Sequence, residues 1–235
     1  MQKVIKKYDV VMDKIRVPVS IVDAGGYVKE YIMSVPKISE ATHALLDSVR
    51  SELLKDSKIG MEEIFDPSRL KKIMAEFSNK TELLLEARVA GASRTTKMFL
   101  TQFLVNEMLG LGMLELLLAD DELEEIVINT SKEPVRVYHR ELGWLKSNIF
   151  VTSEQQIQNY ASIIARRVGR QITTLEPLLD AHLVSGDRAN ATLFPVSTKG
   201  NTLSIRKFAR KPWTITDFLA NRTISFEVGA FLWLT

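Results

Sequence analysis

Two neighbouring stretches decide the fold of this chain: Leu175-Glu-Pro-Leu-Leu-Asp-Ala-His-Leu-Val-Ser-Gly-Asp-Arg-Ala-Asn-Ala-Thr-Leu-Phe-Pro195 and Asn201-Thr-Leu-Ser-Ile-Arg-Lys-Phe208. Their alternation predicts two or three strands that carry arginines out of an otherwise apolar sheet. Arg188 follows a Ser-Gly-Asp turn, and Arg206 interrupts a β-patterned run. A guanidinium is planar and always charged, so it binds phosphate oxygens in pairs. The sequence has no loop that could cradle a triphosphate by itself, and we therefore expect a fragment or half of a phosphate site.

The composition excludes several classes of protein. The 235 residues include no cysteine, which excludes disulfides and thiolate metal sites, and the net charge of +2 gives little reason to expect nucleic acid. The three histidines form no spaced ligand motif, so we expect surface or satisfied histidines and no metal site. The N-terminus does not resemble a secretory signal. The apolar segment 98–118 is interrupted by polar residues and glycines, which favours a buried helix and a soluble, cytoplasmic protein.

The first half of the chain, residues 1–94, is predicted to be a small lobe of one hairpin and several helices. Residues 15–35 alternate around a turn at Asp23-Ala-Gly-Gly26, which indicates the hairpin. Helical periodicity follows over 39–55. Asp66 before Pro67 marks a second helix start, and a further helix is expected over 80–90. The polar segment 91–95 is the expected boundary between lobes.

Residues 95–211 are predicted to form an α+β lobe with a sheet on one side and helices on the other. We expect a helix over 95–109, a short helix ending near 119, and strands at 126–128, 135–138 and around 144–145. Ser153 and Gln156 have the spacing of a capping box and predict another helix. Residues 212–235, with helix starts at Thr214 and Ser225, are interpreted as a linker and the start of a missing C-terminal domain.

The second lobe resembles a known family. Gly110-Leu-Gly-Met-Leu-Glu-Leu-Leu-Leu-Ala-Asp-Asp-Glu-Leu-Glu-Glu-Ile-Val-Ile-Asn129, Leu175-Glu-Pro-Leu-Leu-Asp-Ala181, Gly186-Asp-Arg-Ala-Asn-Ala-Thr192 and Ser204-Ile-Arg-Lys-Phe208 are similar, in order and spacing, to landmarks of the second N-terminal subdomain of type II and type IV secretion-system ATPases. The resemblance covers residues 95–230. The archaeal branch, which drives pilus and archaellum assembly, is most similar because Lys207-Phe208 and Pro212-Trp-Thr-Ile-Thr-Asp217 occur together. Residues 28–37 are similar to the first subdomain of that branch.

The resemblance implies a PAS-like sheet lobe and a role in nucleotide binding. In this family a RecA-like core with a phosphate-binding loop follows, and ATP and Mg²⁺ bind there. This chain contains no Gly-Lys-Ser or Gly-Lys-Thr, so we expect it to be inactive alone and to hold neither ligand tightly. Arg188 and Arg206 match the arginines that reach the phosphates, and Lys207 and Arg210 are expected to be a solvated basic rim. The alternative for each candidate arginine is a structural ion pair with Asp180, Asp187 or Glu176.

The resemblance also implies partners: a homo-hexamer, a membrane platform protein docked on residues 39–90, and a peripheral position at the inner face of the cell membrane. Two other hypotheses stay open. A stand-alone PAS-like sensor would need an apolar pocket lined by Tyr138, Trp144 and Phe150. Nucleic-acid binding would use Arg166-Arg167, Arg170 and residues 206–211, but the low net charge argues against it. A phosphate-binding loop encoded shortly after Thr235 would select the ATPase.

Overall fold

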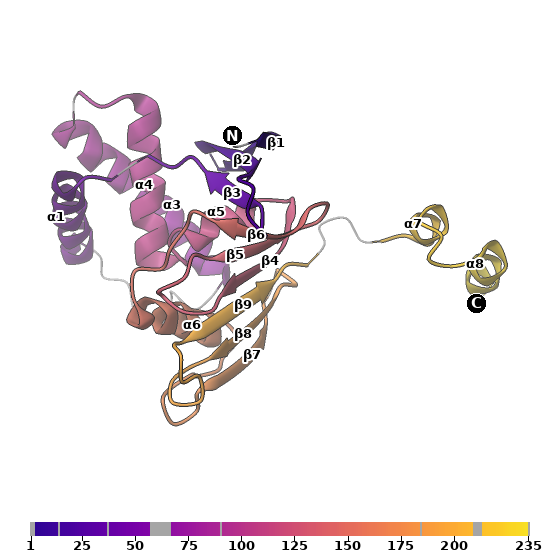
Figure 1. Cartoon of the computed structure of the whole chain (residues 1–235). Helices are drawn as coiled ribbons and strands as arrows, with labels where there is room; N and C mark the ends of the chain where they lie inside the picture. Colours follow the sequence, from indigo (N-terminus) through magenta and orange to yellow (C-terminus); the bar gives the residue numbers. More distant parts are fainter. Residues whose placement is uncertain are drawn as a thin grey trace.

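The centre of the molecule is one sheet. The computed structural model describes residues 3–13, 15–36, 38–56, 67–89, 91–183, 185–208 and 213–234. Its nine-stranded sheet has the order β1-β2-β3-β6-β5-β4-β9-β8-β7 (Figure 1). The strands are β1 (Lys3–Met12), β2 (Ile15–Asp23), β3 (Glu30–Met33), β4 (Leu123–Ile128), β5 (Arg136–His139), β6 (Gly143–Ser147), β7 (Leu178–His182), β8 (Arg188–Thr192) and β9 (Thr202–Arg206).

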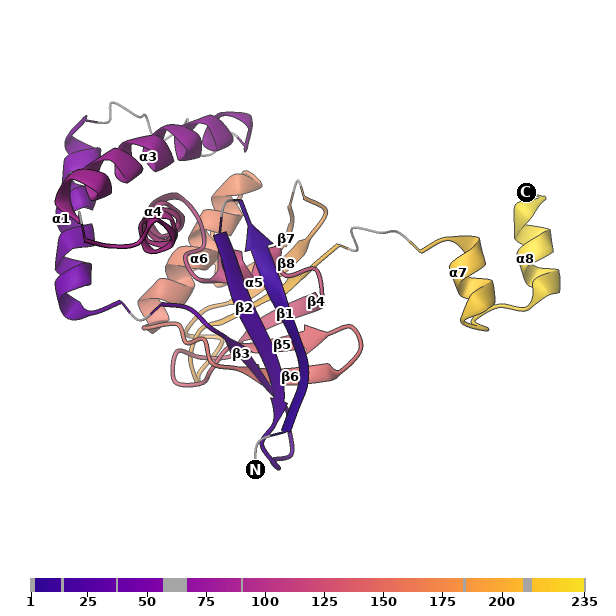
Figure 2. The same cartoon turned by 90° about the horizontal axis from the view of Figure 1, so that it is seen from above.

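Helices cover one face of this sheet. They are α1 (Glu40–Asp56), α3 (Pro67–Arg88), α4 (Arg94–Leu109), α5 (Leu114–Ala119) and α6 (Glu154–Arg167); two further helices, α7 (Ile215–Ala220) and α8 (Phe226–Trp233), follow the last strand. Contacts with the strands come from α4, α5 and α6, while α1 and α3 pack on α4 as an outer layer (Figure 2). The α+β class predicted from the sequence is confirmed, with a larger mixed sheet than expected. That the sheet is specifically PAS-like stays a prediction.

The sheet is continuous across the expected division at residues 94 and 95. The strand pairs are antiparallel except for β3 and β6, which pair in parallel through Glu30 with Lys146 and Tyr31 with Ser147. The buried apolar residues of both halves also belong to one hydrophobic cluster. Separate folding of residues 1–94, 95–211 and 212–235 stays a prediction, but the first two share a sheet.

Several helix starts follow from local capping. Ser93 and Ser153 each accept a hydrogen bond from the backbone N–H three residues on, and Thr214 forms a complete capping box with Asp217. The capping box expected at α6 is only half formed. The Gln156 carboxamide oxygen accepts from the N–H and the hydroxyl of Thr152 and not from the Ser153 N–H. The side chain reaches one residue further back, and the Ser153 hydroxyl alone caps the helix.

Two elements differ from the prediction. Strand β1 was not predicted, because Lys3, Lys6 and Lys7 hide its alternation. The segments expected as two helices, one after Pro67 and one over 80–90, form the single helix α3. After its first residue, Pro67, α3 contains no glycine or proline, so nothing in the sequence breaks it. The proposed N-cap Asp66 lies outside the described residues.

The C-terminal helices stand apart from the sheet (Figures 1 and 2). Gly229 of α8 packs closely against Leu219 of α7, and Trp213, Phe231 and Trp233 are exposed. The apolar segment 98–118 forms α4 and α5, which bury most of their apolar side chains as predicted. None of the described helices combines the length and the apolar character needed to cross a bilayer.

Candidate functional site: an arginine row on the open sheet face

Strand alternation places both candidate arginines on the sheet face opposite the helices. In β8 and β9 the buried side chains are Ala189, Ala191, Leu203 and Ile205, which pack in the core. The residues between them point the other way, so Arg188 and Arg206 are exposed. The prediction that these strands carry arginines out of an apolar sheet is therefore confirmed.

The register brings the two arginines together. Arg188 lies directly opposite Arg206 on one side and opposite His182 on the other. Directly opposed residues of an antiparallel pair have Cα atoms about 4.5–5.5 Å apart, and like charges in such positions repel each other. The arrangement therefore favours an anion that lies across both guanidiniums.

Arg188 already has a counter-charge. Its Nε and Nη2 donate to the two carboxylate oxygens of Asp180 at 3.0 and 2.8 Å. Hydrogen bonding from Arg188 lowers the pKa of Asp180, although both side chains are about half exposed. This is the structural ion pair that the sequence allowed as an alternative, with Asp180 as the partner and not Asp187 or Glu176. Phosphate contact by Arg188 would need this pair to open or to share its donors.

Arg206 has no such partner among the described residues. Glu125 of β4 lies opposite it, but no oxygen of Glu125 comes within ion-pair distance of the guanidinium. The Arg206 side chain is exposed and makes no side-chain hydrogen bond with the described part of the chain. Of the two candidates, only Arg188 has a counter-charge among the described residues.

The turn before β8 holds the end of β9 in place. Asp187 accepts a hydrogen bond from the Phe208 N–H at 2.7 Å and another from the Ser185 hydroxyl at 2.7 Å. Gly186 has φ of 91°, and a Cβ on it would lie 2.9 Å from the Phe208 ring. The turn therefore requires glycine, and it ties the backbone after Arg206 to the backbone before Arg188.

Several basic residues that the sequence assigned to a solvated rim or to nucleic-acid binding make hydrogen bonds within the fold. The Lys207 ammonium donates to the Asp120 backbone carbonyl and is half-buried, so Lys207 is not part of a solvated rim. Arg210 lies outside the described residues. Arg167 donates to the Leu109 carbonyl and Arg170 to the Asp180 carbonyl, which gives both structural roles and weakens the nucleic-acid hypothesis.

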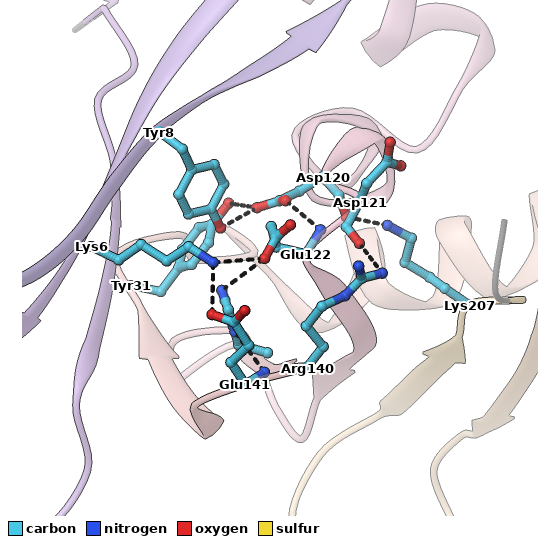
Figure 3. A network of polar contacts seen from close by, with 10 residues as sticks. Lys6, Tyr8, Tyr31, Asp120, Asp121, Glu122, Arg140, Glu141 and Lys207 are labelled. Atoms are coloured by element: carbon cyan, nitrogen blue, oxygen red, sulfur yellow. Dashed lines mark hydrogen bonds and ion pairs between the residues drawn. The ribbon is translucent and has the colours of Figure 1, made fainter. Parts of the chain in front are cut away.

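Lys207 belongs to a polar network that the sequence analysis missed (Figure 3). Its centre is Asp120, which is 2% exposed and follows α5. The hydroxyls of Tyr8 and Tyr31 donate to Asp120 Oδ2 at 2.8 and 2.7 Å, and the Glu122 N–H donates to Oδ1 at 2.9 Å. Burial raises the pKa of both tyrosines, and the neighbouring Asp120 carboxylate raises it further. The network joins β1 and β3 to the start of β4, in the part of the same sheet that carries the arginines.

A second part of the network pairs charges across the same junction. Lys6 Nζ donates to Glu122 at 2.8 Å and to Glu141 at 2.9 Å. These hydrogen bonds raise the pKa of Lys6, and the bond from Lys6 lowers the pKa of Glu122. The Arg140 guanidinium donates to the Asp121 carbonyl at 2.9 Å. The N-terminal strand is thus held at its side chains as well as by its ladder.

His139 beside this cluster differs from the expected surface or satisfied histidine. It is fully buried, and its Nε2 has no hydrogen-bond partner among the described residues and lies 3.7 Å from Glu122 Oε2. Glu122, His139 and Glu141 are ligand types for a metal ion and lie close together. However, the Lys6 ammonium already bridges the carboxylates, and Nδ1 accepts from the Glu141 N–H, which leaves the proton of a neutral imidazole on Nε2. These residues fit an ion-pair cluster better than a metal site.

The three aromatic residues proposed to line a sensor pocket do not lie together. Tyr138 and Trp144 form an edge-to-face pair, with ring centroids 5.3 Å apart, in the same lateral row as Arg206 on the open face. They therefore line no interior cavity. Phe150 does border a cavity of about 290 Å³, together with Phe99, Phe103 and Tyr160.

Comparison with known proteins finds archaeal relatives without an assigned function. No protein-family model matches the chain. Uncharacterized protein MJ0781 of Methanocaldococcus jannaschii is 30% identical over 236 residues, which span 99% of this chain and 30% of the relative. Uncharacterized protein MJ0900 of the same organism is 35% identical over 56% of this chain and 24% of its own length. Uncharacterized protein MJ1288, also from that organism, is 27% identical over 70% of this chain and 64% of its length.

The chain thus spans less than a third of the first two relatives and just under two thirds of the third. Among solved structures, the VirB11 ATPase from the Brucella suis type IV secretion system, in complex with sulphate, is similar with a TM-score of 0.41 and 20% identity. The match covers 48% of this chain and 33% of that chain. A likeness at this level supports no argument about fold or function.

Proposed function

We propose that this chain is the N-terminal portion of a hexameric ATPase that powers protein secretion or the assembly of a type IV pilus or archaellum. The proposal rests on the sequence landmarks that resemble secretion ATPases. In the structure, three of these landmarks form the adjacent strands β7, β8 and β9, and a fourth forms α5 and β4 beside them. The landmarks therefore build one contiguous surface.

The structural observation that supports the proposal is Arg206, which has no counter-charge among the described residues and lies directly opposite Arg188 on an open sheet face. ATP and Mg²⁺ would be held by a following RecA-like domain, which supplies the phosphate cradle and the metal chemistry. This chain would contribute the guanidinium of Arg206, and that of Arg188 after its release from Asp180, to the charge that develops on the transferred phosphate. A positioned guanidinium stabilises that charge without reorganising.

The test uses the intact ATPase. We expect Arg206→Ala to lower ATP turnover by about 10³-fold, since an arginine that acts on transferred phosphate contributes on that order. Thermal stability should change little, because Arg206 is exposed and forms no ion pair with the described residues. Arg188→Ala should also lower turnover. Arg136→Ala, which removes an exposed arginine from β5, is the matched control and should turn over normally. Normal turnover in the Arg206 and Arg188 variants would exclude a phosphate-contacting role for both arginines.

A docking role for the outer helical layer is the second part of the proposal. The facing sides of α3 and α4 border a cavity of about 550 Å³, with Met74 and Met98 among its apolar residues and Asn79 at its exposed rim. We propose that this surface binds a membrane platform protein, which would place the ATPase peripherally at the inner face of the cell membrane. Deleting residues 1–90 would remove β1, β2 and β3 from the shared sheet, so point substitutions are the better test.

Ala75→Arg and Asn79→Arg change exposed positions that line this cavity. Loss of filament assembly or secretion with normal ATP turnover would support docking. Normal assembly in both variants would rule out this surface.

A stand-alone sensor is the other candidate function. The cavity of about 290 Å³ bordered by Phe99, Phe103 and Phe150 is the observation in its favour, at the lower limit of small-ligand sites. Ligand-induced shifts of the Phe99 and Phe103 resonances, together with no ATP turnover by the intact protein, would select the sensor over the motor.

A further inference from the structure

Strand β1 is an open edge of the sheet. It stands first in the strand order and pairs only with β2 among the described strands (Figure 2). Its ten residues extend over about 33 Å. The backbone groups that point away from β2 make no hydrogen bond with any described residue. A long edge with free backbone groups is a template for another strand.

Two features of β1 partly hinder its pairing with a strand of another molecule. A register irregularity lies between Val4 and Lys6, and bulges and lysines both discourage edge-to-edge pairing. The pairing of β1 with β2 is regular from Lys6 to Met12, however. Within this part the Val11 side chain is 54% exposed. A specific partner must therefore match the charges of this edge.

The side chains on the open face of β1 are, in order, basic, acidic and apolar. Lys7, Asp9 and Val11 lie opposite Ser20, Pro18 and Arg16 of β2, on the face away from the core. Lys7 and Asp9 form no ion pair with the described residues. Ile5, at the irregularity, is 38% exposed. Tyr8 points to the other face, toward Asp120, and its hydrogen bond does not depend on the edge.

We infer that β1 pairs antiparallel with β1 of a second copy of this chain, about a two-fold axis at Tyr8. In this register Lys7 of each copy lies opposite Asp9 of the other. Opposite charges in directly opposed positions stabilise a sheet. The sequence of this edge is thus complementary to its own reverse.

Charge also selects this register over its neighbours. A two-fold axis perpendicular to the sheet keeps the faces aligned, so the register can change only in steps that move the axis by one residue along the strand. An axis at Lys7 places the two Lys7 residues opposite each other, and an axis at Asp9 does the same for the two Asp9 residues. Only the axis at Tyr8 pairs unlike charges at both positions. The pairing is independent of the proposed ATPase function.

Charge exchange tests the interface. Sedimentation of the 235-residue chain should show a dimer, twice the mass of the 26.6 kDa chain. Lys7→Asp or Asp9→Lys alone creates like-charge pairs and should give monomers. The combined variant K7D/D9K restores two unlike pairs and should recover the dimer. Arg16→Asp, on the same face but one strand further in, is the control and should stay dimeric.

Three outcomes would contradict the proposed pairing of two β1 strands. A wild-type monomer at high protein concentration overturns it, as does a dimer that survives both single changes. A combined variant that is folded by circular dichroism yet monomeric overturns the Lys7–Asp9 pairing.

Cross-linking tests the register directly, because the natural chain has no cysteine. Opposed Cα atoms about 5.5 Å apart suit a disulfide. A mixture of Lys7→Cys and Asp9→Cys proteins should form a covalent heterodimer under mild oxidation. A mixture of Lys7→Cys and Val11→Cys, which is two residues out of register, should not. Equal yields from the two mixtures would refute the axis at Tyr8.

Discussion

At the residue scale, Asp120 shows how one buried carboxylate can join distant segments. Tyr31→Phe removes a buried donor at 2.7 Å and leaves Asp120 Oδ2 with Tyr8 as its remaining side-chain donor. A buried group that loses a hydrogen bond costs about 1–3 kcal/mol. We expect urea denaturation to show a loss of unfolding free energy in that range. Tyr27→Phe, at a fully exposed position, should show none, and equal losses in both variants would contradict the role of the network.

The buried imidazole of His139 makes the free energy of unfolding depend on pH. Burial lowers its pKa below the ordinary value of about 6.5, so the unfolded chain binds a proton that the folded chain resists. Stability from this group is present above about pH 6.5 and is lost as the pH falls below it. The lowered pKa of Glu122 acts in a separate, more acidic window.

Unfolding free energies at about pH 7.5 and 5.5 should therefore differ more for the wild type than for His139→Gln, because the variant lacks the titrating imidazole. Parallel pH profiles would show that another group causes the loss.

At the element scale, the geometry of the turn before β8 predicts how much an added methyl group at Gly186 destabilises the chain. Gly186→Ala adds a Cβ at positive φ and within 2.9 Å of the Phe208 ring. Gly143→Ala, at φ of 72° with open space around it, isolates the backbone cost alone. We expect both to destabilise by about 1–2 kcal/mol from backbone strain, and Gly186→Ala to cost more, measured by chemical denaturation. Equal costs would show that the contact with Phe208 relaxes freely.

The elements that sequence predicted well are those with local signals. Ser153, Thr214 and Ser225 mark helix starts through their own hydroxyls, and the alternation in β8 and β9 depends on burial of one face. Strand β1 was missed because its lysines are read as solvent-exposed, although Lys6 is held by Glu122 and Glu141 from distant turns. Such long-range pairing has no signature along the chain.

The same reason explains what could be predicted of the candidate site. Arg188 and Arg206 could be assigned to the open face from local alternation. Their direct opposition, and the pairing of Arg188 with Asp180, depend on strand register. The Asp120 network joins residues 112 and 89 positions apart, so it could be found only from the fold.

At the scale of the whole molecule, the open question is whether the two expected lobes are independent. The sheet junction between β3 and β6 has a short parallel pairing, which alone would be weak. It is reinforced by Tyr31 with Asp120, and by Asn148, whose side chain exchanges two hydrogen bonds with the Met33 backbone. The packing of α3 on α4 adds a second interface across the boundary. These contacts should hold the halves together without the connecting chain.

A cut in the turn between α3 and α4 tests this directly. A sequence-specific protease site inserted between Gly91 and Ala92 lies in the exposed turn before Ser93, outside both helices. After complete cleavage we expect residues 1–91 and 92–235 to elute together in native gel filtration, because the sheet and core cross the cut. They should separate only in denaturant, and Tyr31→Phe should lower the concentration required. Uncut protein with the insertion is the control. Two folded fragments that part in native buffer would instead show independent lobes, as the polar segment 91–95 first indicated.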